Sequence, residues 1–141
     1  MQAAHDILVY GVPTSPSTAG ARLSAAYDHF TFPGAVPRTF LGAVLLAGTG
    51  GPLVALAGFA HAQLVVRGVL GAFNAAAVLV FARGVERGFG PGARRWFLGL
   101  VAGQFHLVFY ASRTLPNMFA FGLSELALSL VCLLTLPPPP L

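Results

Sequence analysis

A long stretch without charge constrains this chain more than any other feature: residues 39–66 contain no Asp, Glu, Lys or Arg. Further apolar stretches follow along the rest of the sequence. A helix that crosses the hydrocarbon core of a bilayer needs about 20 predominantly apolar residues. The pattern therefore predicts an all-α integral membrane protein with three to four transmembrane helices, at about 40–59, 62–82, 96–111 and 115–136.

The composition excludes two other classes of protein. Charged residues make up 9% of the 141 residues and hydrophobic residues 56%, whereas soluble domains carry roughly 25% charged residues. Disordered segments need low hydrophobicity and high charge. A soluble chain of this size needs a polar surface that these few charges cannot supply. A bilayer is therefore the expected surrounding.

The net charge of +4 does not indicate a nucleic-acid partner, because the arginines are scattered rather than gathered on one basic face. Only Arg83–Arg95 forms a cluster, and it lies between two apolar stretches, which is typical of a cytosolic loop. The single cysteine, Cys132, lies in an apolar run and predicts neither a disulfide nor a metal site. We expect no metal and no cofactor.

The first 38 residues form a polar segment in which no signal peptide is visible. Residues 2–10 can form a short amphipathic helix with Gln2, His5 and Asp6 on one face, which suits a membrane surface. Residues 11–20, rich in Pro, Gly and hydroxyl side chains, predict a loop. At the other end, residues 137–141 form a Pro-rich tail that stops the last helix.

The topology has two solutions. Arg83–Arg95 is expected in the cytosol, which places residues 111–117 in the lumen. Four full crossings would put residues 1–38 in the cytosol as well. The sequence Gly48-Thr-Gly-Gly-Pro52 predicts an interruption of the first span, and a first span that does not cross would put residues 1–38 in the lumen.

His5 and Asp6 form the first group of candidate site residues. An adjacent His and Asp can orient a polar ligand or transfer a proton. Neighbouring residues on a helix point about 100° apart, so a direct bond between them is not expected. The alternative is a solvated helix face.

The second group lies in the segment 27–40, where aromatic residues alternate with ionisable ones. Aromatic rings offer a flat apolar face to a sugar, Asp binds hydroxyl groups, and Arg binds phosphate with two parallel hydrogen bonds. This chemistry suits a sugar-phosphate site made by Tyr27, Asp28, His29 and Arg38. The alternative is an interfacial aromatic belt with a snorkelling arginine.

The third group joins the end of one apolar stretch to the start of the next: His106, Arg113 and Asn117. Pro116 suits the first turn of the last helix, and Arg113 just before that turn opposes the helix dipole, which indicates an anionic partner. The alternative is a cation that faces water or headgroups. Glu125, in the middle of the last span, is a further candidate because a carboxylate inside the membrane is costly.

Several of these blocks together resemble a known family. They are Gln2-Ala-Ala-His-Asp6, the segment Tyr27–Phe40, Gln63-Leu-Val-Val-Arg-Gly-Val-Leu-Gly71, Gln104-Phe-His106 and Ser112-Arg-Thr-Leu-Pro-Asn117. They occur in the order found early in the fungal-type dolichyl-phosphate-mannose-dependent mannosyltransferases of glycosyltransferase family 22, and are most similar to those that make an alpha-1,6 linkage in protein N-glycosylation. Residues 11–26 match poorly, and residues from Pro137 onward do not match.

The resemblance implies a multi-pass C-type glycosyltransferase fold in the endoplasmic reticulum membrane, with residues 1–38 in the lumen. It implies dolichyl-phosphate mannose as the donor and a dolichyl-diphosphate oligosaccharide as the acceptor. It also implies a single displacement in which a carboxylate deprotonates the attacking hydroxyl. The family's acidic motif lies upstream of the position of Met1, so no catalytic residue is certain, and Asp28 is the weak candidate.

The position of that motif leads us to expect an N-terminal fragment of the enzyme that lacks transfer activity on its own. A small non-catalytic membrane protein remains an alternative, as does a related glycosylphosphatidylinositol or alpha-1,2 mannosyltransferase. A small transporter, suggested by Glu125 and Arg67, is a weaker one because no internal symmetry is visible.

Overall fold

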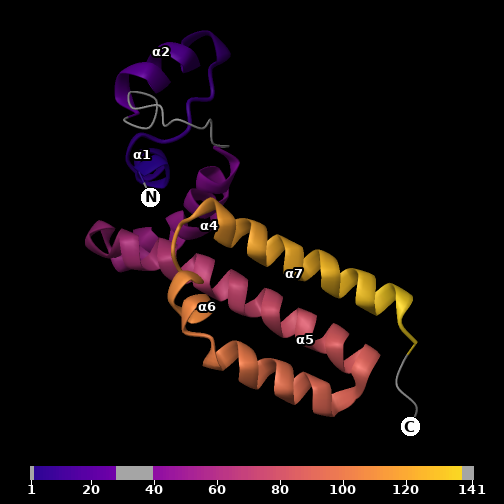
Figure 1. Ribbon diagram of the computed structural model, residues 1–141. Helices are drawn as coiled ribbons and strands as arrows, with labels where there is room; N and C mark the ends of the chain where they lie inside the picture. Colours follow the sequence, from indigo (N-terminus) through magenta and orange to yellow (C-terminus); the bar gives the residue numbers. More distant parts are fainter. Residues whose placement is uncertain (1, 28–39, 138–141) are drawn as a thin grey trace. The chain divides into compact units, whose positions relative to one another are not determined.

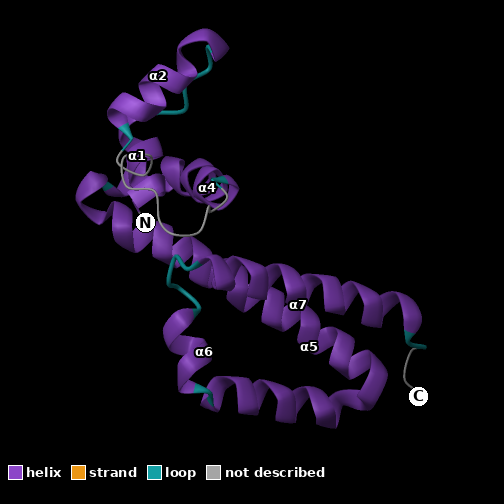
Figure 2. Cartoon of the chain, turned by 45° about the horizontal axis from the view of Figure 1, so that its top comes forward, coloured by secondary structure: helices purple, strands orange, loops and turns teal. Residues whose placement is uncertain are grey.

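The computed structural model describes residues 2–27 and 40–137, and within these ranges the chain is helical and contains no strand (Figure 2). Two helices there are long and apolar enough to cross a membrane, Phe59–Gly103 and Pro116–Thr135. These features confirm the prediction of an all-α membrane protein. The chain divides into two compact units, residues 1–66 and 67–141, which are described separately below.

The first unit contains α1 (Gln2–Tyr10), α2 (Pro16–Ala26), α4 (Leu41–Ala57) and a short 3₁₀ turn, η1 (Phe59–His61). Helix α1 packs against α4. Ile7, Tyr27 and Ala47 form a small buried core, and Leu23 and Phe40 pack against it. This core draws on three separate segments and so holds the polar residues of α1 beside an apolar helix.

Helix α2 is a correction, because the sequence predicted a loop over residues 11–20. The helix begins at Pro16, which occupies its first turn. Proline is well tolerated there because its missing N–H would have no partner inside the helix. Leu23 and Ala26 then face the core of the first unit, and that burial stabilises a segment whose hydroxyl residues and glycine favour a loop.

Helix α4 is a second correction. The segment Gly48–Pro52 was expected to interrupt the span, but the helix continues through Pro52 to Ala57. Proline cannot donate a hydrogen bond to the carbonyl of residue 48, and its ring crowds that turn. Packing against α1 supports the helix at this point, since a Cβ atom added to Gly51 would lie 3.7 Å from Leu8. Gly58, with φ of 86°, ends the helix in a conformation that glycine adopts without strain.

The second unit is dominated by α5 (Ala62–Gly103), which bends sharply at Gly90 (φ 85°) and Pro91. The two limbs of α5 turn back on each other, and the rings of Phe81 and Phe97 meet edge to face with centroids 5.4 Å apart. Helix α6 (Phe105–Tyr110) and α7 (Pro116–Thr135) follow. In Figures 1 and 2, α7 runs alongside the first limb of α5.

Glycines set the close contact between α5 and α7. A Cβ atom added to Gly84 would lie 3.0 Å from Cβ of Cys132, and one added to Gly122 would overlap the ring of Phe73. Because residues 84 and 122 carry no side chain, the two helix backbones can approach closely, as is common between membrane helices. This contact fixes the register of α7 on α5.

The boundaries of the middle helices differ from those expected at 62–82 and 96–111. The first limb of α5 continues past residue 82 to the bend at Gly90, and the second limb runs from Pro91 to Gly103. Gln104 then has extended backbone angles and separates α5 from α6. The arginine cluster therefore lies on helical turns that flank a bend, not on a loop.

Candidate functional site

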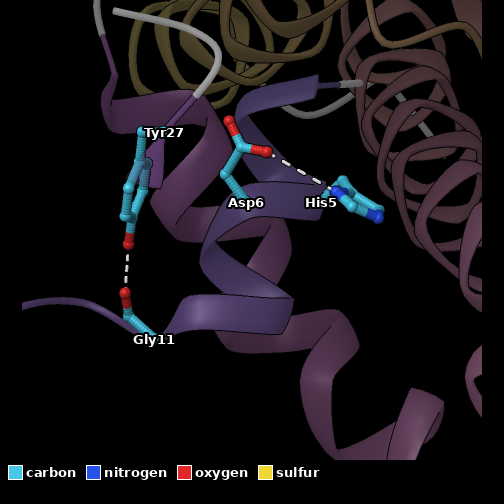
Figure 3. Close-up of polar contacts among 4 residues, drawn as sticks. All are labelled: His5, Asp6, Gly11 and Tyr27. Carbon is cyan, nitrogen blue, oxygen red and sulfur yellow. Dashed lines mark hydrogen bonds and ion pairs between the residues drawn. The ribbon is translucent and has the colours of Figure 1, made fainter. Parts of the chain in front are cut away.

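The structure places the predicted site residues in two groups. His5, Asp6 and Tyr27 lie together in the first unit (Figure 3). His106, Arg113 and Asn117 lie around the connection from α6 to α7 in the second unit. Asp28, His29 and Arg38 lie outside the described residues.

The alternative interpretation, in which Asp6 lies on a solvated face of α1, is wrong. Only 2% of Asp6 is exposed, and its neighbours Ala4 and Ile7 are buried with it. Asp6 lies close enough to Tyr27 for its charge to raise the pKa of the Tyr27 hydroxyl. A buried carboxylate is retained in a protein only when partners satisfy it, which marks this position as more than a surface charge.

His5 and Asp6 also contact each other, although their positions on the helix argued against it. Nδ1 of His5 lies 3.5 Å from Oδ1 of Asp6, which is the long end of a hydrogen bond. The imidazole is mostly exposed, and it meets the ring of Phe59 edge to face with centroids 5.7 Å apart. His5 therefore presents a polar, orientable ring to the outside while Asp6 supports it from the interior.

Tyr27 closes this group from the other side. It is 2% exposed, and its hydroxyl donates a hydrogen bond to the backbone carbonyl of Gly11 (Figure 3). Burial raises the pKa of the Tyr27 hydroxyl, the negative charge of Asp6 raises it further, and Arg22 lowers it. The hydroxyl thus stays protonated and acts as a fixed donor that ties the end of α1 to residue 27.

An apolar groove of about 500 Å³ lies between α1 and α4. Its lining contains no charged residue and includes Leu8, Val44, Gly51 and Phe59. Phe59 also contacts His5, so the polar group and the groove share a border. An apolar groove beside an orientable imidazole can bind a molecule with a hydrocarbon part and a polar head.

The second group of site residues surrounds a tight turn between α6 and α7. Arg113 is exposed, and its guanidinium carbon lies 4.2 Å from the centre of the Phe109 ring. Its backbone N–H donates to the carbonyl of Tyr110 at 2.8 Å, and its carbonyl accepts from Leu115 at 2.7 Å. The backbone of the turn is therefore held while the cation remains available.

Other aromatic rings pack around Phe109, the ring that this cation contacts. Phe105 stacks on Phe109 at 5.4 Å, and Tyr110 meets Phe109 edge to face at 5.1 Å. His106 is exposed on α6, and Asn117 is exposed in the first turn of α7. A cation over an aromatic face with hydrogen-bonding groups nearby can bind a phosphate and a sugar ring.

Asn74 is a residue that the sequence reasoning missed. It lies in the first limb of α5, is 1% exposed, and its Nδ2 donates a 2.7 Å hydrogen bond to the carbonyl of Ala111 in the turn. The available signal was a lone amide in an otherwise apolar stretch, since polar residues inside membrane segments are costly and usually pair with backbone carbonyls.

The charged residues at the other end of the second unit are engaged in structural contacts. Arg94 forms a 2.7 Å ion pair with Glu86 across the bend, and Nε of Arg87 donates to the carbonyl of Leu136 at 2.9 Å. Near the middle of α7, Oε2 of Glu125 is buried, and among the described residues no hydrogen-bond partner reaches it. Within the same residues, no group of three His, Cys, Asp or Glu side chains forms a metal site.

These observations define a helical membrane protein with an apolar groove and a cation held on an aromatic platform. A family model matches residues 24–135, and the chain belongs to the Alg9-like mannosyltransferase family. No solved structure matches the chain.

The relatives extend this assignment. The chain is 34% identical over 160 residues to the Dol-P-Man:Man(7)GlcNAc(2)-PP-Dol alpha-1,6-mannosyltransferase of Saccharomyces cerevisiae, over 94% of this chain and 27% of that protein. It is 36% identical to the proteins of the same name from Arabidopsis thaliana and Drosophila melanogaster, over 72% and 73% of this chain and 22% and 16% of theirs. The chain thus spans about a quarter or less of the length of these curated relatives.

Proposed function

We propose that these residues belong to an enzyme that transfers mannose from dolichyl-phosphate mannose to a seven-mannose dolichyl-diphosphate oligosaccharide with an alpha-1,6 linkage. The observation that carries the proposal is the family match over residues 24–135 together with relatives whose shared name specifies this reaction. The membrane helices support it because both of these substrates carry a dolichyl chain.

In this proposal each described group has a chemical task. The groove between α1 and α4 takes part of a dolichyl chain, and His5, supported by Asp6, orients a polar group at its border. Arg113 binds a lipid phosphate, with Phe109 holding the guanidinium in place. His106 and Asn117 contribute hydrogen bonds to sugar hydroxyls near the same turn.

The segment 27–40 supplies the remaining candidates. Arg38 is proposed to bind a phosphate and His29 to contact the sugar. Tyr27 was expected to contact the sugar as well, but its ring is buried and its hydroxyl donates to the Gly11 carbonyl, so its role is to hold the start of this segment. The reaction is a single displacement in which the acceptor hydroxyl attacks C1 of the mannose, the bond from C1 to the phosphate oxygen breaks, and a carboxylate takes the hydroxyl proton. Asp28 is the candidate for that carboxylate within these residues.

We propose a multi-pass location in the endoplasmic reticulum membrane, with residues 1–38 and the turn at Arg113 in the lumen. The two candidate spans and the arginine cluster support this orientation, since cytosolic loops carry an excess of arginine. The named relatives use dolichyl-linked substrates, which fits the same membrane.

A segment exchange tests the proposal. The 141 residues replace the aligned segment of the S. cerevisiae relative in cells that lack that relative, and the lipid-linked oligosaccharides are sized. We expect the eight-mannose form to appear, and the same exchange carrying Arg113→Ala to accumulate the seven-mannose form. A stable, membrane-inserted exchange protein that leaves only the seven-mannose form would contradict the alpha-1,6 assignment.

A further inference from the structure

The hydrogen bond between Asn74 and the turn at Ala111 connects two separate helices. Residues 74 and 111 are 37 positions apart, and the 2.7 Å bond from Nδ2 of Asn74 joins α5 to the end of α6. The carbonyl of Ala111 belongs to the residue that caps α6. The last carbonyls of a helix have no partner inside that helix, so the Asn74 amide satisfies one of them.

The other end of the same amide meets α7. Oδ1 of Asn74 is buried and accepts no conventional hydrogen bond from the described residues. A Cβ atom added to Gly122 would lie 2.5 Å from this oxygen, so Oδ1 occupies the space directly over the Gly122 backbone. This is the position of a weak Cα–H···O contact between helices. One side chain of α5 thus contacts both the turn and the helix that follows it.

The segment between these two contacts contains Arg113. Gly71, one turn of α5 before Asn74, also reaches the same turn, because a Cβ atom added there would lie 3.3 Å from Cβ of Ser112. The backbone bonds of Arg113 to Tyr110 and Leu115 hold the turn internally, but they do not place it on α5. The Asn74 amide and the close contact at Gly71 place the turn on α5.

We propose that Asn74 is a positioning residue that seats the Arg113 turn on α5 and thereby sets where the guanidinium meets a lipid phosphate. The seating follows from the contacts alone, while the consequence for phosphate binding rests on the proposed function. Loss of one buried neutral hydrogen bond shifts an equilibrium by about fivefold, so removing the amide shifts the equilibrium between the seated and the unseated turn toward the unseated turn by about that factor.

The first measurement needs no enzyme activity. In the 141-residue chain in membranes, Cys132→Ala removes the native thiol, and Gly71→Cys with Ser112→Cys creates a pair whose spacing is close to the Cβ separation of a disulfide. Asn74→Leu keeps the number and branching of the side-chain heavy atoms and removes the amide. We expect mild oxidation to cross-link the pair more slowly, by up to about fivefold, in the Asn74→Leu variant than in the chain that retains Asn74.

Ser129→Ala is the matched control for this measurement. Ser129 is buried in the same contact between α5 and α7, but its hydroxyl donates to the carbonyl of Leu126 within its own helix. It should leave the cross-linking rate unchanged. An equal rate with and without the Asn74→Leu substitution would overturn the proposal, whatever the activity measurements show.

The second measurement uses the exchange protein described above. We expect Asn74→Leu to raise KM for dolichyl-phosphate mannose about fivefold while kcat changes by less than about twofold. In an Arg113→Ala background, Asn74→Leu should change KM no further, because the residue that it positions is already missing. Equal effects in both backgrounds would show a general structural role and contradict positioning through Arg113.

The two measurements separate the proposals. If the unmodified exchange protein transfers no mannose, the proposed function fails, and the cross-linking rate still decides whether Asn74 seats the turn. If Asn74→Leu slows cross-linking but leaves KM unchanged in an active exchange protein, the seating has no consequence for the donor and the positioning role is wrong.

Discussion

At the scale of single residues, several polar side chains of this chain have defined partners. Asp6 and Asn74 are almost completely buried, and Arg113 lies against an aromatic ring rather than extending freely. In an apolar surrounding such contacts matter, because an unsatisfied polar group is expensive there.

Arg113 provides the first prediction. Arg113→Lys keeps the positive charge but loses the planar group that binds phosphate with two parallel hydrogen bonds. In the exchange protein we expect KM for dolichyl-phosphate mannose to rise about tenfold, the low end of the effect of a charged hydrogen bond. Arg83→Lys, which changes an exposed arginine near the bend of α5, is the control and should leave KM unchanged. Unchanged kinetics in the Arg113→Lys variant would mean that Arg113 only anchors the turn at the membrane surface.

Tyr27 provides a prediction about pH. Because its pKa is raised above the ordinary value of 10.0, the folded chain holds this proton more tightly than the unfolded chain does. The free energy of unfolding should therefore be unaffected by Tyr27 below pH 10 and should fall as the pH rises above it. Unfolding of the 141-residue chain in detergent, followed from about pH 8 to 11, measures this.

Two variants make the pH prediction specific. Tyr27→Phe removes the bond to the Gly11 carbonyl and should lower the free energy of unfolding by about 1 kcal/mol below pH 10, with a smaller decline above it. Tyr10→Phe changes an exposed tyrosine in the same unit and should behave like the unmodified chain. The same decline in both variants would exclude Tyr27 as its origin.

The sequence allowed His5, Arg113 and Asn117 to be selected, because ionisable or amide groups next to apolar stretches are visible in a single chain. Burial of Asp6 was not predictable from α1 alone, since the burial of one flank of a helix depends on the segments that pack against it. The role of Asn74 depends on Ala111, 37 residues away. Both features depend on contacts between distant segments, which the local spacing of apolar residues does not reveal.

At the scale of elements, glycine and proline define where helices end and bend. Pro116 starts α7 and Pro137 follows its end, so the last helix could be located closely from the sequence. Pro52 has the same signal but lies inside α4, where packing against α1 supports the helix. Glycine and proline thus predict a helix end reliably only where packing against neighbouring helices does not stabilise further helical turns.

The bend of α5 allows a comparison of two stabilising features. Gly90 has φ of 85° and ψ of 171°, where a side chain costs about 1–3 kcal/mol, so Gly90→Ala should lower the free energy of unfolding by that amount. The ion pair between Glu86 and Arg94 is about one-third exposed, and such pairs contribute less than about 1 kcal/mol. Glu86→Gln should therefore have the smaller effect.

Thermal unfolding of the two variants in the same detergent measures the difference. Gly92→Ala is the control, because this glycine lies on the same bend, has an ordinary φ, and has open space around its Cα. If Glu86→Gln destabilises the chain more than Gly90→Ala, the ion pair and not the backbone conformation holds the bend.

At the scale of the molecule, the polar groups of the second unit lie in two places along α5. The arginine cluster lies at the bend at Gly90, and the turn that contains Arg113 lies beside Asn74, well back along the first limb (Figure 1). The 20 residues of α7 extend about 30 Å at 1.5 Å per residue, the thickness of the hydrocarbon core. The two ends therefore suit opposite sides of a membrane.

Orientation is testable with an impermeant thiol reagent on sealed microsomes. In a Cys132→Ala background, Gly92→Cys marks the bend and Thr114→Cys marks the turn. We expect labelling from the cytosolic side at position 92 and not at position 114, with both labelled after the membrane is opened. The reverse pattern would place the arginine cluster in the lumen and contradict the proposed topology.

The parallel contact of α5 with α7 also sets an order of events during synthesis. Arg87 lies 49 residues before the carbonyl of Leu136 that it caps, so this bond cannot form until Leu136 has left the ribosome. The donor of Asn74 has a shorter wait, since its acceptor is the carbonyl of Ala111. Insertion of α5 therefore precedes its full stabilisation, and Arg87 depends on water, lipid headgroups or the insertion machinery until the end of α7 is synthesised.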